Sequence, residues 1–197
     1  LAGAVADGYV AGAQLYVDAN GNGVGDPGEL VGTTDANGNF SFTTTLTGPL
    51  IATGGTNIDT GLPNTMVLKA PAGSTIVNPL TTLVQELVQG GATVGDAQAK
   101  VLASLGLPTV DLTTYDPLSQ GATDATALAV QKAAAQVAAI IAIGSDDAAA
   151  LASLVALIDG GTPLDLTDTT DLNTILGGAL SPAEIADIEA LNDAIAS

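Results

Sequence analysis

The residues from Asp18 to Glu29 read DANGNGVGDPGE and place oxygen-bearing side chains at regular offsets. Calcium takes about six to eight oxygen ligands, and a twelve-residue loop supplies them from positions 1, 3, 5, 7, 9 and 12. Gly23 at the sixth position permits a sharp turn, and Val24 at the seventh offers its backbone carbonyl. The pattern therefore predicts a Ca²⁺ site whose ligands are Asp18, Asn20, Asn22, Val24, Asp26 and Glu29.

The residues before this loop, GAQLYV, alternate in the manner of a β-strand, whereas an EF-hand requires an entering helix. We therefore expect an EF-hand-like loop on a β scaffold. The competing interpretation is a Gly- and Asn-rich hairpin connection that binds nothing. That alternative does not require Asp26 and Glu29 at their offsets.

A second stretch, TTDANGNF at 33–40, repeats the DANGN string. Asp35 and Asn37 are secondary metal candidates, which would complete the first site or form another. Leu46 stands at the twelfth position, where a calcium loop needs an acid. The alternative is a tight Asn-Gly hairpin turn without an ion.

The elements around these loops fall into two halves with different periods. Up to Val77, short Val-, Thr-, Tyr- and Phe-rich runs are separated by Gly, Asn and Pro, which is typical of strands. The fold class predicted is α+β, and residues 1–77 are expected to form a small antiparallel β-sandwich. The predicted strands are 9–18, 29–34, 39–45, 49–53, 66–70 and 74–77.

Residues 78–197 carry a helical period and predict an Ala- and Leu-rich α-helical bundle. The clearest helix begins with Asn78 as N-cap and Pro79 at its first position, and Gly90 and Gly91 end it. The other helices are predicted from Thr93 to about 105, over 124–143, from Ser145 to 158, over 168–176, and from Ser181 to the end.

The composition limits the partners. The chain has 197 residues, 47% of them hydrophobic, with 3 Lys, no Arg and a formal net charge of −18. Nucleic acid and anionic membranes are poor partners for such a chain, and cations are favourable ones. The sequence contains no Cys, so disulfides do not hold the fold together.

The longest apolar stretch, 127–143, contains Gln131, Lys132 and Gln136 and is richer in Ala than in Leu. We interpret it as a buried helix and expect no membrane insertion. The sequence opens on Leu1 without a basic and apolar leader, which indicates a mature product or a piece of a longer protein.

Catalysis is not expected. Without His, Cys, Arg or Trp, the chain cannot build a serine triad, a thiol nucleophile or an imidazole-ligated zinc site. A glycosidase needs two opposed carboxyl groups, usually beside aromatic rings, and the chain has 3 Tyr and 2 Phe. The sequence therefore predicts a protein that is not an enzyme.

The succession VDANGNGVGDPGE (17–29) and TTDANGNFSF (33–42) resembles the B-type repeats of bacterial surface proteins of the serine-aspartate-repeat class. It is also similar to modules of very large secreted adhesins and matrix proteins of Gram-negative bacteria. The resemblance covers residues 1–77 and implies a prealbumin-like β-sandwich in which calcium rigidifies loops. The segment APAGSTIVNPLTTLV at 70–84 and the residues after it resemble segments that follow such modules in large repetitive bacterial proteins, and this resemblance implies no activity.

The expected function is a calcium-stabilised structural or adhesive module, secreted to the bacterial cell surface or extracellular matrix. Its expected partners are calcium and neighbouring modules or identical subunits. One alternative is a self-assembling subunit of an extracellular filament or sheath, in which the N-terminal run at 1–17 pairs with a neighbour's sheet edge. Another is a calcium-dependent carbohydrate-binding module.

Overall fold

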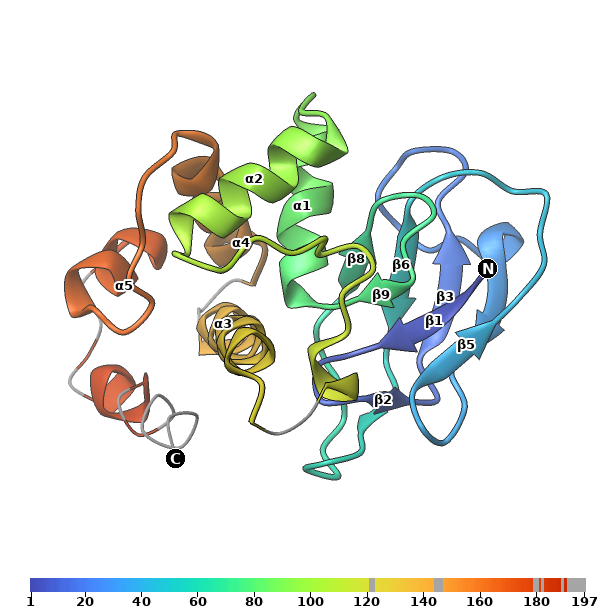
Figure 1. Ribbon diagram of the computed structural model, residues 1–197, viewed down its shortest axis with the longest axis horizontal. Helices are drawn as coiled ribbons and strands as arrows, with labels where there is room; N and C mark the ends of the chain where they lie inside the picture. Colours follow the sequence, from blue (N-terminus) through green and yellow to red (C-terminus); the bar gives the residue numbers. More distant parts are fainter. Residues whose placement is uncertain (121–122, 144–146, 179–180, 182, 189, 191–197) are drawn as a thin grey trace.

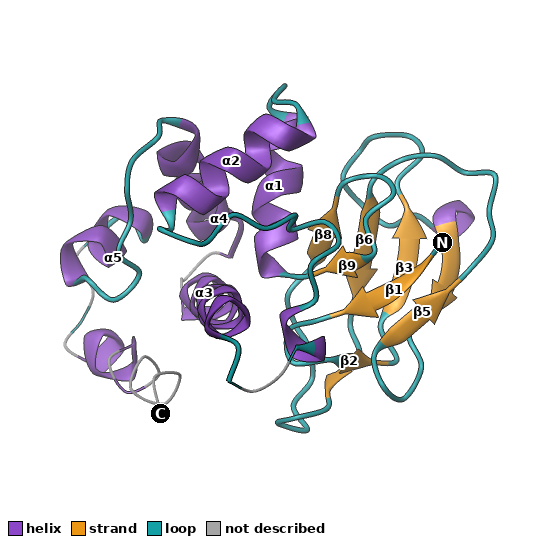
Figure 2. Ribbon diagram, viewed as in Figure 1, coloured by secondary structure: helices purple, strands orange, loops and turns teal. Residues whose placement is uncertain are grey.

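The computed structural model describes residues 1–120, 123–143, 147–178, 181, 183–188 and 190 (Figure 1). Strands occupy the N-terminal part and helices the C-terminal part (Figure 2). The predicted α+β order of the two halves is confirmed.

Nine short strands form the β part, and most pairs are antiparallel. One sheet has the order β5-β1-β9, a second has the order β4-β3-β6-β8, and β2 pairs with β7. The bounds are β1 Ala2–Val5, β2 Val10–Ala11, β3 Gln14–Val17, β4 Leu30–Thr33, β5 Asn39–Ser41, β6 Leu50–Thr53, β7 Thr56–Asn57, β8 Leu68–Ala70 and β9 Ile76–Val77.

The expectation of a purely antiparallel sandwich is wrong for one pair. β1 and β9 run parallel, with Ala4 opposite Ile76 and Val5 opposite Val77. Parallel neighbours require a long crossover connection, and here the connection is the remainder of the β part. Because the chain returns to β1 only after the second sheet is built, local patterns do not reveal this pairing.

The two larger sheets share one apolar cluster. Val5, Phe40 and Val77 from the three-stranded sheet belong to the same buried cluster as Leu15 and Leu50 from the four-stranded sheet. In β5 the burial alternates along the strand, so that Phe40 is buried between two exposed neighbours. The inner faces of the two sheets thus enclose the core of the β part.

The helical part has its own core. Side chains of α1, α2, α3, α4 and α5 form a second buried cluster that includes Leu80, Val101, Val137, Leu154 and Leu172. The helix bounds are α1 Pro79–Gln89, α2 Val94–Ser104, α3 Ala125–Ile143, α4 Asp147–Asp159 and α5 Thr169–Ile175, with 3₁₀ turns η1 at Pro27–Glu29 and η2 at Pro117–Ser119.

The helix starts follow the predicted caps where these are described. The Asn78 side chain accepts a hydrogen bond from the N–H of Thr81, and Thr93 accepts one from the N–H of Asp96. The predicted cap Ser145 lies outside the described residues. Of the helix predicted from Ser181, helical structure is described over 183–188.

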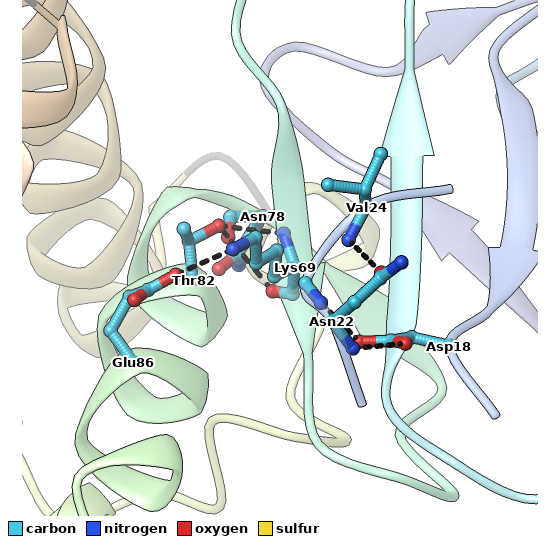
Figure 3. A network of polar contacts seen from close by, with 8 residues as sticks. Asp18, Asn22, Val24, Lys69, Asn78, Thr82 and Glu86 are labelled. Atoms are coloured by element: carbon cyan, nitrogen blue, oxygen red, sulfur yellow. Dashed lines mark hydrogen bonds and ion pairs between the residues drawn. The ribbon is translucent and has the colours of Figure 1, made fainter. Parts of the chain in front are cut away.

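The first turn of α1 covers the edge strand β8. The N–H of Lys69 donates to Thr82 Oγ1 at 2.9 Å, and the Thr81 hydroxyl donates to the Lys69 carbonyl at 2.8 Å. One turn further on, Lys69 Nζ forms an ion pair with Glu86 at 2.8 Å (Figure 3). Although the sequence suggests a boundary at Val77, α1 contributes directly to the edge of the sheet.

Two further contacts join the halves. The carbonyl of Thr113 accepts the N–H groups of Thr75 at 2.9 Å and Ile76 at 3.1 Å, and so covers the strand β9. The Tyr9 hydroxyl donates to Asp116 Oδ2 at 2.7 Å. The connector between α2 and α3 therefore packs against the β part.

Helix α3 is long and apolar enough, by length and composition, to cross a membrane. Its Val130, Val137 and Ile140 side chains are buried in the helical core. One face of α3 therefore lies in the helical core, as expected for a helix that packs inside the protein.

Replacing Thr81 by Val preserves the shape of a buried side chain but removes the hydrogen bonds of its hydroxyl. The N–H of Asn78 then loses its acceptor, and the Lys69 carbonyl loses the closer of its two hydroxyl donors, at 2.8 Å. We expect Thr81→Val to lower the free energy of unfolding by about 1–3 kcal/mol. The exposed Thr45 provides the control, since Thr45→Val should stay within about 0.5 kcal/mol of the parent in urea titrations. Equal effects of the two substitutions would contradict the role of Thr81.

Burial and the neighbouring Asp116, through its hydrogen bond and its charge, raise the pKa of Tyr9 to about 12. Since the folded state favours the neutral phenol, this contribution to stability is present below pH about 10 and is lost as the pH rises towards about 12. Tyr9→Phe should remove the tyrosine ionisation near pH 12 from absorbance titrations and reduce the fall in stability over this pH range. Tyr16→Phe should retain both features. If the stability of Tyr9→Phe fell with rising pH as steeply as that of the parent, another group would be responsible for the fall.

Candidate metal centre

The loop 18–29 connects β3 to β4, which are neighbours in the four-stranded sheet. A strand enters it, as predicted, and the 3₁₀ turn η1 closes it. The acids at its two ends are buried: Asp18 is 2% exposed and Glu29 is 6% exposed. The central residues Asn20, Asn22 and Val24 are exposed.

The Asp18 carboxylate organises the first half of the loop. Its Oδ1 accepts the N–H groups of Gly21 at 2.8 Å and Asn22 at 3.1 Å, and its Oδ2 accepts that of Gly23 at 2.8 Å. Hydrogen bonds to an ionised acceptor are stronger than neutral ones. Three backbone amides thus wrap around one carboxylate.

The Glu29 carboxylate closes the loop from the other end. Its Oε1 accepts the N–H groups of Ala19 at 2.9 Å and Asn20 at 3.1 Å, and its Oε2 accepts that of Asp26 at 3.3 Å. The first and twelfth positions of the loop therefore both turn inward, onto backbone groups from its two halves.

The middle positions meet at Asp26. The carboxamide Nδ2 atoms of Asn20 and Asn22 each donate to Asp26 Oδ2 at 2.9 Å. Asn20 Oδ1 accepts the N–H of Asn22 at 2.9 Å, and Asn22 Oδ1 accepts that of Val24 at 2.8 Å. The fold therefore connects all five predicted side-chain ligands through hydrogen bonds within the loop.

A glycine with a positive φ allows the loop 18–29 to bend. Gly23 has a φ of 77°, which is the left-handed conformation that the sixth position of a calcium loop requires. The Val24 side chain is apolar and 58% exposed. Its backbone carbonyl is therefore the group of this residue that could bind an ion.

A close approach that the sequence did not predict supports Asp18. A Cβ built on Gly48 would lie 2.0 Å from the Asp18 carbonyl oxygen, and the N–H of Asp18 donates to the Pro49 carbonyl at 2.9 Å. The Gly-Pro dipeptide signals a turn. Its position against Asp18 follows only from the pairing of β3 with β6.

The loop also lies beside the junction with the helical part. A Cβ built on Gly23 would lie 3.5 Å from Lys69 Nζ and 3.6 Å from Gln89 Nε2, at the end of α1. Figure 3 shows Lys69 between Glu86 on one side and Asn22, followed by Asp18, on the other. The loop therefore meets both the edge strand β8 and α1.

The second DANGN string folds into a turn of its own. Asp35 Oδ1 accepts the N–H groups of Asn37 at 2.8 Å and Asn39 at 2.9 Å, and these bonds hold the pKa of the exposed Asp35 below its ordinary value. The turn follows the far end of β4, beside Tyr9 and Ala13, away from the loop 18–29. The structure therefore does not bring Asp35 and Asn37 to the first loop.

The donor set of the loop consists of oxygens: three carboxylates, two carboxamides and backbone carbonyls. Hard cations such as Ca²⁺ prefer such a set. No group of three or more His, Cys, Asp or Glu side chains is arranged to hold a metal within the part of the chain that the structure describes. Amide and carbonyl oxygens, which a twelve-residue loop also uses, do not enter into that count.

A scan against protein-family models and searches of curated proteins and solved structures found no match to this chain.

Gly48→Ala should displace the backbone of Asp18, because the added methyl would overlap the Asp18 carbonyl oxygen. We expect a loss of stability of about 1–3 kcal/mol, as is typical of overpacking. Gly28→Ala is the matched control in the loop itself, since no atom lies within 4 Å of the added Cβ there. Urea unfolding of both variants tests the difference, and equal stabilities would refute the close contact as a constraint.

Proposed function

We propose that this chain is a non-catalytic, calcium-stabilised structural or adhesive module of a secreted bacterial cell-surface or extracellular-matrix protein. The observation that carries the proposal is the convergence of Asp18, Asn20, Asn22, Asp26 and Glu29 within one twelve-residue loop. Their offsets are those of a calcium loop, and the loop bends at Gly23 as such a loop must.

The charge balance of the loop supports a bound cation. Asp18 and Glu29 are buried, and neither takes part in the ion pairs found among the described residues. Backbone N–H groups compensate part of the cost of burying these charges, and a divalent cation would compensate more. The nearby Lys69 is itself paired with Glu86, so its charge opposes calcium less than that of a free lysine would.

Calcium in this position would act mechanically. The loop joins two adjacent strands, and at Gly23 it lies beside Lys69 and Gln89, where sheet and helix meet. An ion bound to both ends of the loop would restrain the β3–β4 connection and, through it, the junction of the two halves. A rigid junction is useful in a module that transmits force or keeps a fixed spacing.

The extracellular setting rests on composition and resemblance. A chain with a net charge of −18 and no Cys suits a calcium-rich medium, where extracellular modules bind with Kd of about 10⁻⁴–10⁻³ M. We further propose that the β part is prealbumin-like. Two facing sheets of three and four strands around one core support this assignment.

Calcium should raise the melting temperature of the full chain relative to protein in excess chelator. At a calcium concentration about a hundred times Kd, the gain is about 2.7 kcal/mol, or about 5–10 °C for a domain of this size. Calorimetry with calcium, magnesium and chelator measures the effect. Identical melting curves in calcium and chelator would refute the proposal.

Single substitutions show which residues are responsible for the calcium-dependent shift in melting temperature. Glu29→Gln should abolish most of the calcium-dependent shift, because the twelfth position loses its charge. Asp59→Asn, at an exposed acid of another loop, should retain the full shift. Asp35→Asn tests the second DANGN string, and a reduced shift in that variant would indicate a separate ion there.

A further inference from the structure

The sequence contains three Asn-Gly dipeptides, and two of them lie in the loop 18–29. At such a dipeptide the backbone nitrogen of glycine can attack the side chain of asparagine, because glycine has no side chain to hinder the approach. We propose that Asn37 is a site of spontaneous deamidation in the folded protein, whereas Asn20 and Asn22 are protected. This proposal does not depend on calcium binding.

The reaction consumes only water. The Gly38 nitrogen loses its proton and bonds to Cγ of Asn37, the Cγ–Nδ2 bond breaks, and the amide nitrogen leaves as ammonia. Water then opens the succinimide ring at either carbonyl, which yields aspartate or isoaspartate. No electrons are transferred, and the protein supplies both reacting groups.

Exposure does not separate the three asparagines, since all are exposed, but their hydrogen bonds do. Asn20 and Asn22 are held at both ends of the carboxamide: each Nδ2 donates to Asp26, and each Oδ1 accepts a backbone N–H. Rotation of either carboxamide towards the next nitrogen would break both bonds. Attack at these positions therefore requires the loop to open.

The attacking nitrogens of the loop are also held by a charge. The N–H groups of Gly21 and Gly23 each donate to the Asp18 carboxylate at 2.8 Å. A negative charge at this distance opposes loss of the amide proton, and the hydrogen bond directs the nitrogen away from the asparagine. Both steps that precede ring closure are thus disfavoured.

Asn37 lacks these restraints. Its N–H is bound by Asp35, but its carboxamide makes no hydrogen bond within the part of the chain that the structure describes. The N–H of Gly38 donates to a neutral acceptor, the Asp35 carbonyl, at the longer distance of 3.1 Å. The DANGN string therefore occurs twice in one chain: in the loop 18–29 its asparagines are protected from deamidation, and in the turn at Asp35 its Asn37 is reactive.

Reaction at Asn37 would alter a structural turn. The Gly38 carbonyl accepts the N–H of Val5 at 3.0 Å, and a Cβ on Gly38 would lie 2.8 Å from Cβ of Tyr9. Isoaspartate lengthens the backbone by one carbon at the connection between β4 and β5. The aspartate product adds a charge next to Asp35, so the modified chain is separable by ion exchange.

The test is incubation of the full, metal-free chain in mildly alkaline buffer with chelator, followed by peptide mapping with mass spectrometry. We expect Asn37 to react at least about tenfold faster than Asn20 and Asn22, a difference of about 1.4 kcal/mol in activation free energy. In urea the three sites should react at similar rates. Equal rates in the folded chain, or no reaction at Asn37 while the unfolded chain reacts, would overturn the proposal.

Asp26→Ala provides a second test. It removes the acceptor shared by the Asn20 and Asn22 carboxamides. Both sites should then react faster, while the rate at Asn37, which lies in another turn, stays unchanged. A circular dichroism spectrum like that of the parent shows that the variant is folded. Unchanged rates at Asn20 and Asn22 would show that these hydrogen bonds do not protect them.

Discussion

The backbone of Lys69 in β8 is hydrogen-bonded to hydroxyl groups of α1, and much of the remaining structure depends on this contact. An edge strand exposes unpaired N–H and C=O groups, which are costly when buried without partners. Thr82 accepts the N–H of Lys69, and Thr81 donates to its carbonyl. The threonines occupy these positions because Asn78 caps the helix directly above the strand. The start of α1 thus serves the helix and the sheet together.

This contact sets the position of the helical core relative to the sandwich. Once the first turn of α1 is fixed, Leu80 and Leu83 face the other helices, while Glu86 reaches back to Lys69. Thr113 and Asp116 add a second attachment through β9 and Tyr9. The two periods in the sequence therefore correspond to two cores. Where these cores meet, backbone groups of β8 and β9 are hydrogen-bonded to the helical part.

The packing of α1 against β8 also determines which residues lie around the candidate metal loop 18–29. Its internal hydrogen bonds come from residues within twelve positions of one another, so they follow directly from the spacing. Lys69, Gln89 and Gly48 reach it from distant parts of the chain. A loop that the sequence describes as a metal site is thus also a contact between the sandwich and the first helix.

Helices and loops that are marked by characteristic residues at their own ends could be predicted from the sequence. The bounds of α1 follow from Asn78, Pro79 and the two glycines after Gln89, and the position of the loop follows from its offsets. β1 was not separately predicted, because Ala2–Val5 consists of small residues without alternation. It is a strand because β5 and β9 pair with it on both sides.

The sequence by itself determined the two periods, the helix caps and the set of oxygen donors from Asp18 to Glu29, since each depends on neighbours within a few residues. Only the tertiary structure decided that Asp18 and Glu29 are buried, that the two DANGN strings lie apart, and that β1 runs parallel to β9. Burial and strand pairing depend on which distant segments return to a residue. The spacing of neighbouring residues does not specify which distant segment this will be, because any compatible strand or helix can form hydrogen bonds with the same backbone groups.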